Sequence, residues 1–498
     1  MTISQTETWT DPGRTPGVTH APARQPYSRW VSLLVLCTGF LLIVVDGTVV
    51  NVALPSIQAD LGFTQAALAW VVNAYLIAYG GLLLLAGRLG DLIGRKRVFL
   101  LGVGMFTVAS ALCGLSFSQP VLIAARFVQG IGGAVGSAVI LGMVVTMFQE
   151  PAERARAMGI FAFVASAGGA IGLLAGGLIT EAVSWHWIFF VNVPIGVVTI
   201  VLGLRLIAPD AGLGLSAGAD VLGAILVTAA LMLGVYAIVA SDVYGLGSSH
   251  TIGFGVVAVA MLIAFVVRQA RVRSPLMPLR LFTSRNFSGA NAVQALMVAG
   301  FFGFFFLGSL YMQRILQYGP LQVGLAFLPD TIAMAAMSIG LSARLITRFG
   351  SRVVLLVGLT SISASMFLFA RSPLQSDYVV DLLLPMTLAG IGAGLAFTSL
   401  SMLAMADATE SDSGLASGLL NTTTQVGASL GLAILATIAS ERTRDGLSRG
   451  ENAISALSDG YHLTWAISTG LMLVCLAVAA IVLKEPAVSG SAAIRSAQ

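Results

Sequence analysis

Long runs of apolar residues dominate this 498-residue sequence and limit what the chain can fold into. A helix needs about 20 mostly apolar residues to cross the hydrocarbon core of a bilayer, and the runs are of this order. They predict fourteen membrane-spanning helices, at residues 30–54, 68–89, 98–117, 121–148, 157–180, 186–206, 219–240, 251–267, 287–312, 321–343, 353–370, 379–405, 414–439 and 462–483.

The overall composition supports the same fold class. Hydrophobic residues make up 57% of the chain and charged residues only 10%, whereas soluble domains carry about 25% charged residues. Because so few polar groups cannot cover a water-facing surface, the chain needs the lipid bilayer as its partner. The net charge of +4 does not indicate nucleic acid, because the arginines cluster in short segments between the apolar runs. We therefore predict an all-α polytopic membrane protein without a nucleic-acid partner.

The distribution of basic residues predicts the orientation of the chain. With fourteen spans, both termini lie on one side of the membrane. Twenty of the 26 Lys and Arg residues fall on that side, five fall on the other, and Arg126 lies within a span. Since segments rich in Lys and Arg stay in the cytoplasm, we expect both termini to be cytoplasmic in a multi-pass protein of the plasma membrane.

Repeated glycine patterns indicate that the chain contains a duplicated unit. Gly130-Ile131-Gly132 recurs as Gly390-Ile391-Gly392, at an offset of 260 residues, and glycines of the fifth span recur in the thirteenth at an offset of 259. Two six-helix halves with a binding site between them are typical of transporters. The predicted divisions are a disordered cytoplasmic tail at 1–29, an N-terminal half at 30–206, a two-helix insert with cytoplasmic loops at 207–286, a C-terminal half at 287–483 and a cytoplasmic tail at 484–498.

Two charged residues inside the spans are candidates for proton coupling. Asp46 lies near the middle of the first span, and Arg126 shares one face of the fourth span with Gln129 and Gly130. Ionisable groups inside a bilayer are costly and usually functional. Arginine stays protonated, so Arg126 can only bias a nearby carboxylate, which would carry the proton. The alternatives are a static ion pair or a hydrogen-bonded residue at a helix kink for Asp46, and an arginine bound to backbone carbonyls for Arg126.

The segment that closes the second span has the pattern of a gate or hinge. Glycines and an acid alternate there with basic residues, so that ion pairs along one helix face are feasible. The alternative is that the basic residues only mark the cytoplasmic side. The residues of this predicted gating loop are Gly87, Arg88, Gly90, Asp91, Gly94 and Arg95.

Further glycines predict close helix packing, and one more acid lies in a span. Gly130 with Gly168, Gly172, Gly176 and Gly177 would form smooth, bendable helix faces that act as a hinge, unless they serve packing alone. Asp330 follows Pro329 in the tenth span. We expect Gln129 and Asp330 to line a substrate cavity, where an acid would favour a cationic substrate; an Asp330 in interfacial water is the alternative.

No motif of an enzyme occurs in the sequence. A phosphate-binding loop, a zinc-protease motif and a nucleophile elbow are missing, and the four histidines lack metal-ligand spacing. We therefore predict that the chain is not an enzyme and binds no metal or cofactor.

The motifs together resemble the major facilitator superfamily, and within it the fourteen-span drug:proton antiporter branch. The resemblance covers residues 30 to 483, with Leu173 and His186 departing from the residues common in this branch. It implies alternating access, proton-driven export, and coupling through Asp46 and Arg126. Its motifs are the segments 46–55, 87–97, 126–134 and 185–196.

The expected function is proton-driven export of a small, amphipathic, drug-like or antibiotic molecule by a monomer. An uptake facilitator or proton symporter on the same fold is the alternative, and the direction of flux separates the two. A receptor or scaffold that transports nothing would instead tolerate neutralisation of Asp46.

Overall fold

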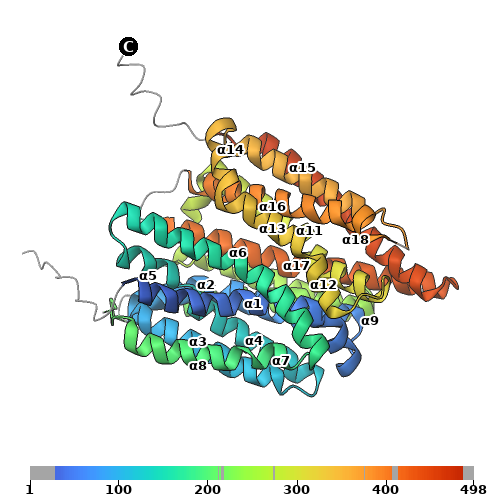
Figure 1. Ribbon diagram of the computed structural model, residues 1–498, viewed down its shortest axis with the longest axis horizontal. Helices are drawn as coiled ribbons and strands as arrows, with labels where there is room; N and C mark the ends of the chain where they lie inside the picture. The colour runs from blue at the N-terminus through green and yellow to red at the C-terminus, as the bar shows by residue number, and fades with distance from the viewer. Residues whose placement is uncertain are drawn as a thin grey trace, which may run out of the picture.

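The computed structural model describes residues 29–485, except 211, 215–217, 273–274, 375 and 407–412, and these residues form helices and connecting loops. The predicted tails at 1–29 and 484–498 lie outside the described residues, apart from Arg29, Lys484 and Glu485. The bundle has two ends. The termini end is where α1 begins and α18 ends, and the far end carries residues 62–64 and 315–319 (Figure 1).

The N-terminal half contains eight helices, several of which are pieces of one predicted span. They are α1 (Arg29–Leu61), α2 (Gln65–Ile93), α3 (Arg95–Gly114), α4 (Gln119–Ser137), α5 (Ile140–Met147), α6 (Pro151–Ala182), α7 (Trp187–Phe190) and α8 (Asn192–Leu206). Local signals set some of these ends. Thr64 caps α2 by accepting a hydrogen bond from the Ala67 amide, and Gly94 separates α2 from α3 with a φ of 100°.

The insert and the C-terminal half complete the chain. The insert consists of α9 (Val221–Tyr244) and α10 (Ser249–Arg271), followed by a short 3₁₀ helix, η2 (Leu279–Thr283). The C-terminal half contains α11 (Arg285–Arg314), α12 (Pro320–Ala326), α13 (Leu328–Ala336), η3 (Met337–Leu341), α14 (Ser342–Phe349), α15 (Ser351–Phe369), η4 (Tyr378–Leu382), α16 (Leu383–Met405), α17 (Ser413–Ser448) and α18 (Ala453–Val482).

Among the described residues, twelve helices are long and apolar enough to cross a membrane, and residues 167–182 and 320–336 form shorter apolar helices. The all-α membrane fold is thus confirmed. The predicted span at 321–343 is broken into α12, α13, η3 and α14. Pro329 stands in the first turn of α13, where its missing amide hydrogen costs nothing but where it cannot continue the preceding helix.

Equivalent helices of the two halves pack in equivalent pairs. α3 packs on α4 as α15 packs on α16, and α1 packs on α6 as α11 packs on α17. Individual contacts repeat as well. A Cβ on Gly130 would lie 2.4 Å from the carbonyl oxygen of Tyr75, and one on Gly390 would lie 2.0 Å from that of Asp330. Only glycine allows such an approach of two backbones.

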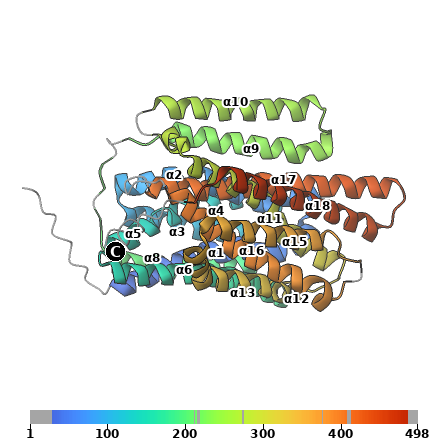
Figure 2. The ribbon, with the colours of Figure 1, turned by 90° about the horizontal axis from the view of Figure 1, so that it is seen from above.

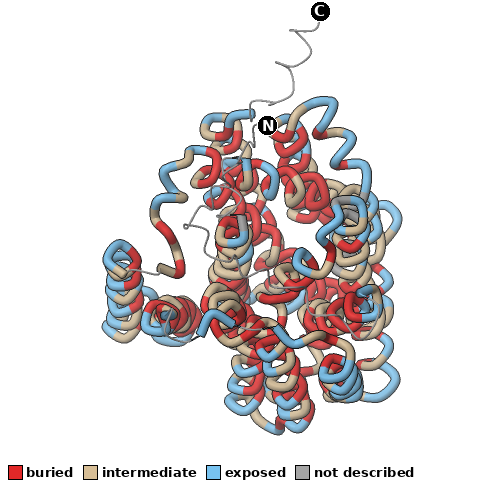
Figure 3. Tube along the Cα trace, turned by 90° about the vertical axis from the view of Figure 1, so that its left-hand side faces the viewer, coloured by how far each residue is buried: buried red, intermediate tan, exposed pale blue. Residues whose placement is uncertain are grey.

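The insert lies at one side of the bundle. α9 packs on α2 and α17, whereas α10 lies beyond α9 and packs mainly on it (Figure 2). Buried residues concentrate in the interior of the bundle, and exposed residues lie mostly on its outer surface (Figure 3).

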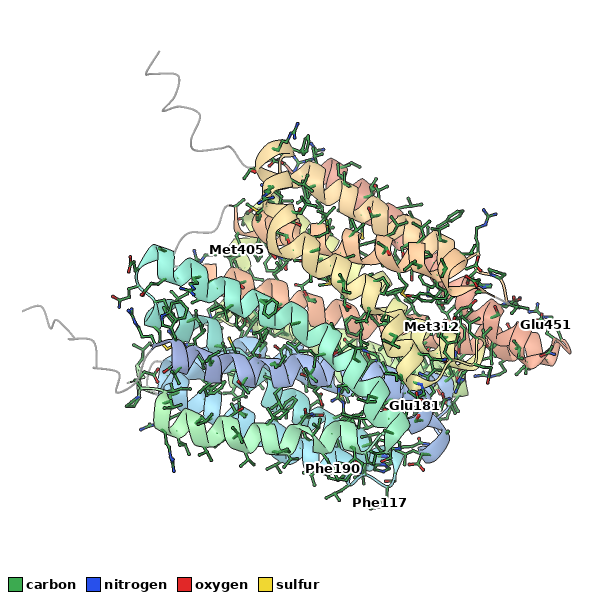
Figure 4. The ribbon with its side chains drawn as sticks, in the orientation of Figure 1. Phe117, Glu181, Phe190, Met312, Met405 and Glu451 are labelled. Carbon is green, nitrogen blue, oxygen red and sulfur yellow. The ribbon has the colours of Figure 1, made fainter. Side chains whose placement is uncertain are left out.

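The two halves contact each other along α2 and α17 and also at the far end. Gln313 of α11 donates a hydrogen bond to the Val52 carbonyl of α1 at 2.9 Å. Glu181 of α6 accepts one from the Leu321 amide of α12 at 3.0 Å (Figure 4). From there α6 and the α13–α14 run diverge toward the termini end (Figure 1). The two halves are therefore closed against each other at the far end.

Candidate functional site

Asp46 is the centre of a buried polar cluster in the N-terminal half. It is the eighteenth residue of the 33-residue α1, so it lies near the middle of that helix. Its side chain is 0% exposed. A carboxylate at such a position needs hydrogen bonds and a counter-charge, because burial without them costs several kcal/mol (about 3–5 when one partner is removed).

Three side chains from two other helices satisfy the Asp46 carboxylate. Arg126 of α4 donates from Nη1 to Oδ2 at 2.6 Å, which forms an ion pair. Gln129, one turn further along α4, donates from Nε2 to Oδ1 at 2.7 Å. Asn192, the first residue of α8, donates from Nδ2 to Oδ1 at 2.9 Å. The carboxylate thus joins α1, α4 and α8.

Arg126 is held by more than its ion pair. Its side chain is 1% exposed. Nε donates to the Val71 carbonyl at 2.9 Å, and Nη1 also donates to Oε1 of Gln129 at 2.6 Å. The ring of Tyr75 lies 4.4 Å from the guanidinium carbon, in position for a cation–π contact. The guanidinium therefore keeps several acceptors even if Asp46 loses its charge.

Gln129 connects this cluster to α3. Its Nε2 donates to the Ser110 hydroxyl at 2.8 Å, and its Oε1 accepts from the Cys113 thiol at 3.5 Å. Sequence analysis missed Ser110, Tyr75 and Asn192. Of these, only Asn192 had a signal, because it is a polar residue inside the 185–196 motif.

The predicted gating loop is the junction of α2 and α3: its first four residues lie in the last turns of α2, Gly94 separates the helices, and Arg95 begins α3. Asp91 and Arg95 form an ion pair, with Oδ1 and Nη2 3.1 Å apart. Arg95 also donates to the Gly142 carbonyl of α5 at 3.0 Å. The Nε of Arg88 donates to the Gly218 carbonyl at 3.2 Å. The loop therefore binds both its own half and the linker that leads to the insert.

An acid that sequence analysis missed fastens this loop. The Asp210 carboxylate accepts hydrogen bonds from the backbone amides of Arg95, at 2.6 Å, and Lys96, at 3.0 Å. These are the free amides at the start of α3, which favour a negative charge. In the C-terminal half, Glu485 accepts from the amides of Ser351, at 2.7 Å, and Arg352, at 2.9 Å.

The predicted hinge glycines make close contacts, some within the N-terminal half and one with the C-terminal half. Four of them pack within the N-terminal half: Gly130 on Tyr75 of α2, and Gly168, Gly172 and Gly176 on Val44, Thr48 and Val49 of α1. Gly177 instead faces the other half. A Cβ at Gly177 would lie 2.6 Å from the Pro320 carbonyl oxygen.

Asp330 is placed apart from the Asp46 cluster, on α13 of the C-terminal half. It is 0% exposed, and neither carboxyl oxygen has a hydrogen-bond partner among the described residues. The backbone of Asp330 packs on Gly390 as that of Tyr75 packs on Gly130. Asp330 is therefore the counterpart, in the C-terminal half, of Tyr75 in the N-terminal half. Thus the two residues predicted to line one cavity, Gln129 and Asp330, lie in different halves.

The fold and the buried ion pair together define a multi-pass helical membrane protein. Comparison with known proteins gives its family: residues 36–432 match the Major Facilitator Superfamily, and the chain belongs to this superfamily. The predicted resemblance is confirmed. Membership makes the chain a transporter rather than an enzyme.

Two named relatives match most of the chain in sequence. It is 36% identical over 459 residues to the puromycin resistance protein pur8 of Streptomyces alboniger, covering 91% of this chain and 90% of that one. It is 38% identical over 422 residues to the cephamycin export protein CmcT of Amycolatopsis lactamdurans, covering 83% and 85%.

Solved structures show the same fold at lower sequence identity. A POT family peptide transporter gives a TM-score of 0.66 at 15% identity, covering 91% of this chain and 97% of that one. A bacterial homolog of the human lysosomal transporter Spinster gives 0.65 at 16% identity, covering 92% and 99%.

Proposed function

We propose that this protein exports a small antibiotic-like molecule across the cytoplasmic membrane in exchange for protons. Two relatives that match more than four fifths of the chain are named for puromycin resistance and cephamycin export. The single observation that carries proton coupling is the buried Asp46–Arg126 pair. Arg126 stays charged, so the pair changes its charge only when Asp46 takes up a proton.

Protonation of Asp46 gives the cluster two states. In one state the ionised carboxylate draws α1, α4 and α8 together through Arg126, Gln129 and Asn192. In the other the ion pair is lost, while the Val71 carbonyl still holds Arg126. Proton binding is coupled to transport if the protonated and the ionised cluster favour different orientations of the transporter, one inward-facing and one outward-facing.

Alternating access would use the contacts at the far end. We propose that α6 and the α12–α14 run are the two remaining spans, which gives fourteen, and that both termini are cytoplasmic. The closed far end then faces outward, so the structure corresponds to an inward-facing state. The repeated helix pairs support the division into halves at 30–206 and 287–483, with the insert between them.

Asp330 is proposed to favour cationic groups on the substrate. The support is its burial without a hydrogen-bond partner, since a buried carboxylate gains most from a cation that comes to it. The gating-loop residues are proposed to control opening at the termini end, because Asp91 and Arg95 pair there and Arg95 reaches α5.

Efflux of a fluorescent lipophilic cation and of puromycin from cells tests the proposal. Cells expressing the chain should export at least one of them, and a protonophore should stop export. Asp46→Asn should reduce export to the level of cells lacking the protein, because the carboxylate bound to Arg126 can no longer change charge. Asp60→Asn, at an exposed position on the same helix, should export normally.

Three outcomes would contradict this function. Accumulation rather than loss of the compound would favour uptake by a facilitator or symporter. Normal export by Asp46→Asn, at equal protein level, would remove the proton site. Export that survives the protonophore would exclude the proton gradient as the energy source.

A further inference from the structure

Asp330 is a buried acid on α13 without a counter-charge. Every residue of α13 is described, and Asp330 alone among them is buried. It is 0% exposed, and neither carboxyl oxygen has a hydrogen-bond partner among the described residues. A buried carboxylate with no partner is so costly that the group takes up a proton and becomes neutral instead. Asp330 is therefore a neutral carboxylic acid in this structure.

The helices that pack on α13 bring no charged side chain to this acid. They are α16, α6, α12 and η3. The sequences of α12, η3 and α16 contain no Asp, Glu, Lys, Arg or His. These three elements surround Asp330 with apolar and hydroxyl side chains, so they cannot stabilise its ionised form.

The charges of α6 lie far from Asp330 along the helix. Gly177 of α6 contacts Pro320, and Leu173 contacts Gly324. This antiparallel register brings the part of α6 near residue 167 level with Asp330.

The charged residues of α6 nearest to that level are Arg156, toward the termini end, and Glu181, toward the far end. Each lies more than ten residues away, which is about 15 Å or more of helix. Glu181 is also engaged elsewhere, since it accepts a hydrogen bond from the Leu321 amide. No described side chain of α6 therefore pairs with Asp330.

The internal repeat explains why this acid has no counter-charge. Asp330 is the counterpart of Tyr75, whose ring centre lies 4.4 Å from the guanidinium carbon of Arg126. Counted from the glycine that each of the two contacts, the residue of α16 equivalent to Arg126 is Met386. Met386 is fully buried. The C-terminal half thus has an uncharged thioether where the N-terminal half has a cation.

A hydroxyl group takes over the backbone contact of the missing arginine. In the N-terminal half, Arg126 Nε donates to the Val71 carbonyl. The equivalent carbonyl of the C-terminal half is that of Ala326, and it accepts from the Tyr378 hydroxyl at 3.0 Å. Because a tyrosine carries no positive charge, this replacement leaves Asp330 without a counter-ion.

The segment that carries the acid is built to move. Pro329 directly precedes it in the first turn of α13, and the π-helical turn Met337–Leu341 follows α13. Such turns occur frequently at functional sites. The residues of α13 that follow Asp330 are partly or fully exposed. A rotation of this short helix would therefore bring the carboxyl group out of its contact with α16.

We propose that Asp330 is a second proton-binding site, and that a cationic substrate displaces its proton. When the cation arrives, the O–H bond of the acid breaks, the proton passes to water, and the carboxylate pairs with the substrate. The exchange replaces one positive charge by another, so no ion is left buried and unpaired. The proton site is independent of transport, whereas the displacement rests on the proposed export of a cation.

Infrared absorption of the purified protein tests the charge state of Asp330. A neutral carboxyl group has a carbonyl stretching band above the amide bands, and a carboxylate does not. In a detergent without ester groups, the wild-type protein should show this band at neutral pH, and Asp330→Asn should lack it. Asp46→Asn should keep the band, because Asp46 is ionised beside Arg126. Asp381→Asn, at a partly exposed position of the same half, should also keep it.

Charge variants of Met386 test the physical reason. Met386→Arg supplies the counter-charge that the repeat lacks, so the band should disappear although Asp330 is present. Met386→Leu, which is similar in size and uncharged, should keep the band. If Met386→Arg does not assemble, the comparison of the wild type with Asp330→Asn still decides whether the acid is neutral.

Proton release on binding of tetraphenylphosphonium tests the exchange. In weakly buffered detergent solution with a pH-indicator dye, the wild-type protein should release a proton for each cation that binds. Asp330→Asn should release none. Asp46→Asn should release as much as the wild type, because the proton comes from the other half.

Two results would overturn the proposal. A wild-type spectrum equal to that of Asp330→Asn would show that Asp330 holds no proton. A failure of tetraphenylphosphonium to bind, or binding without proton release, would exclude exchange at this acid. The proposed function stands or falls separately: export that stops in Asp46→Asn would establish it even if Asp330 were ionised, and the infrared band would remain even if cells exported nothing.

Discussion

The carboxylate of Asp46 and the guanidinium of Arg126 stabilise each other because neither reaches solvent. The two side chains are 0% and 1% exposed, and their closest atoms are 2.6 Å apart. A buried pair of this kind adds little net stability, since desolvation of both ions offsets their attraction. The pair instead makes each buried charge depend on its partner, because either ion alone is costly to bury.

Removal of one partner should therefore be worse than removal of both. Arg126→Ala leaves Asp46 as a buried acid without a counter-charge and should lower the free energy of unfolding by about 3–5 kcal/mol. The double variant Asp46→Asn with Arg126→Ala should be more stable than Arg126→Ala alone. Thermal unfolding of the purified protein in detergent, followed for all four combinations, measures this coupling.

Equal stability of Arg126→Ala and the double variant would show that the two charges do not interact in the folded protein. A normally stable Arg126→Ala protein would show that water reaches the site and screens the Asp46 carboxylate.

Only part of this cluster could be predicted from the sequence. Asp46 and Arg126 stand out because ionisable residues are rare in apolar runs, and Gln129 lies one turn from Arg126 on the same face. Ser110 and Asn192 are uncharged, and such residues occur in many spans. Which of them join the cluster depends on how α3 packs on α4 and α8 on α1, which local patterns do not contain.

Among the elements, the junction of α2 and α3 is bound to the linker that follows α8. Asp210 accepts from the amides at the start of α3, and the Leu213 amide donates to the Asp91 carbonyl at 2.9 Å. Glu485 repeats the first contact at the start of α15. In each half, an acid that follows the last helix fixes the start of the third span.

Two glycines of this loop should respond differently to alanine. Gly94 has a φ of 100°, and its Cβ would lie 2.8 Å from the Asp210 carbonyl oxygen, whereas a Cβ at Gly87 has no neighbour within 4 Å. Gly94→Ala should cost about 1–3 kcal/mol because of backbone strain and should slow efflux. Gly87→Ala should be neutral or slightly stabilising, because alanine favours a helix.

Efflux rate at equal protein level, together with thermal unfolding, separates the two variants. The placement of the linker would be wrong if both variants were equally impaired or if Gly94→Ala were harmless.

The break in the run at 320–349 also belongs to the level of elements. Hydropathy predicts one span at 321–343, because apolar residues continue through it. A proline in the first turn of α13 and a π-helical turn over Met337–Leu341 interrupt the regular hydrogen bonds instead. The run packs against α6 near the far end and diverges from it toward the termini end (Figure 1). A hydropathy average cannot detect such breaks, since it measures composition and not hydrogen bonding.

For the whole molecule, the relation of the two halves depends on contacts at the far end. Gly177 packs on the Pro320 carbonyl, close to the hydrogen bond between Glu181 and the Leu321 amide. The Arg314 side chain of α11 also donates to Gln58 of α1. All of these contacts would have to separate for the far end to open.

A larger residue at Gly177 should shift the protein toward an open far end. Gly177→Ala puts a methyl group 2.6 Å from the Pro320 carbonyl oxygen, and such overpacking costs about 1–3 kcal/mol. Spin labels at Phe117 and Leu374, exposed far-end positions in opposite halves, should then move apart in electron–electron distance measurements. The labels are introduced after replacement of the three native cysteines.

The matched control is Gly169→Ala on the same helix, since a Cβ there has no neighbour within 4 Å. It should leave the distance unchanged. An unchanged distance in Gly177→Ala would show that this contact does not keep the far end closed.

The sequence by itself determined the membrane fold class, the superfamily and the two charged residues of the cluster. Long apolar runs, glycine motifs and isolated charges are properties of consecutive residues, so they can be read without coordinates. The tertiary structure decided which uncharged side chains complete the Asp46 cluster, which glycine faces the other half, and how the linker after α8 binds the start of α3. These depend on which helix faces meet, and that is settled only when all the helices pack together.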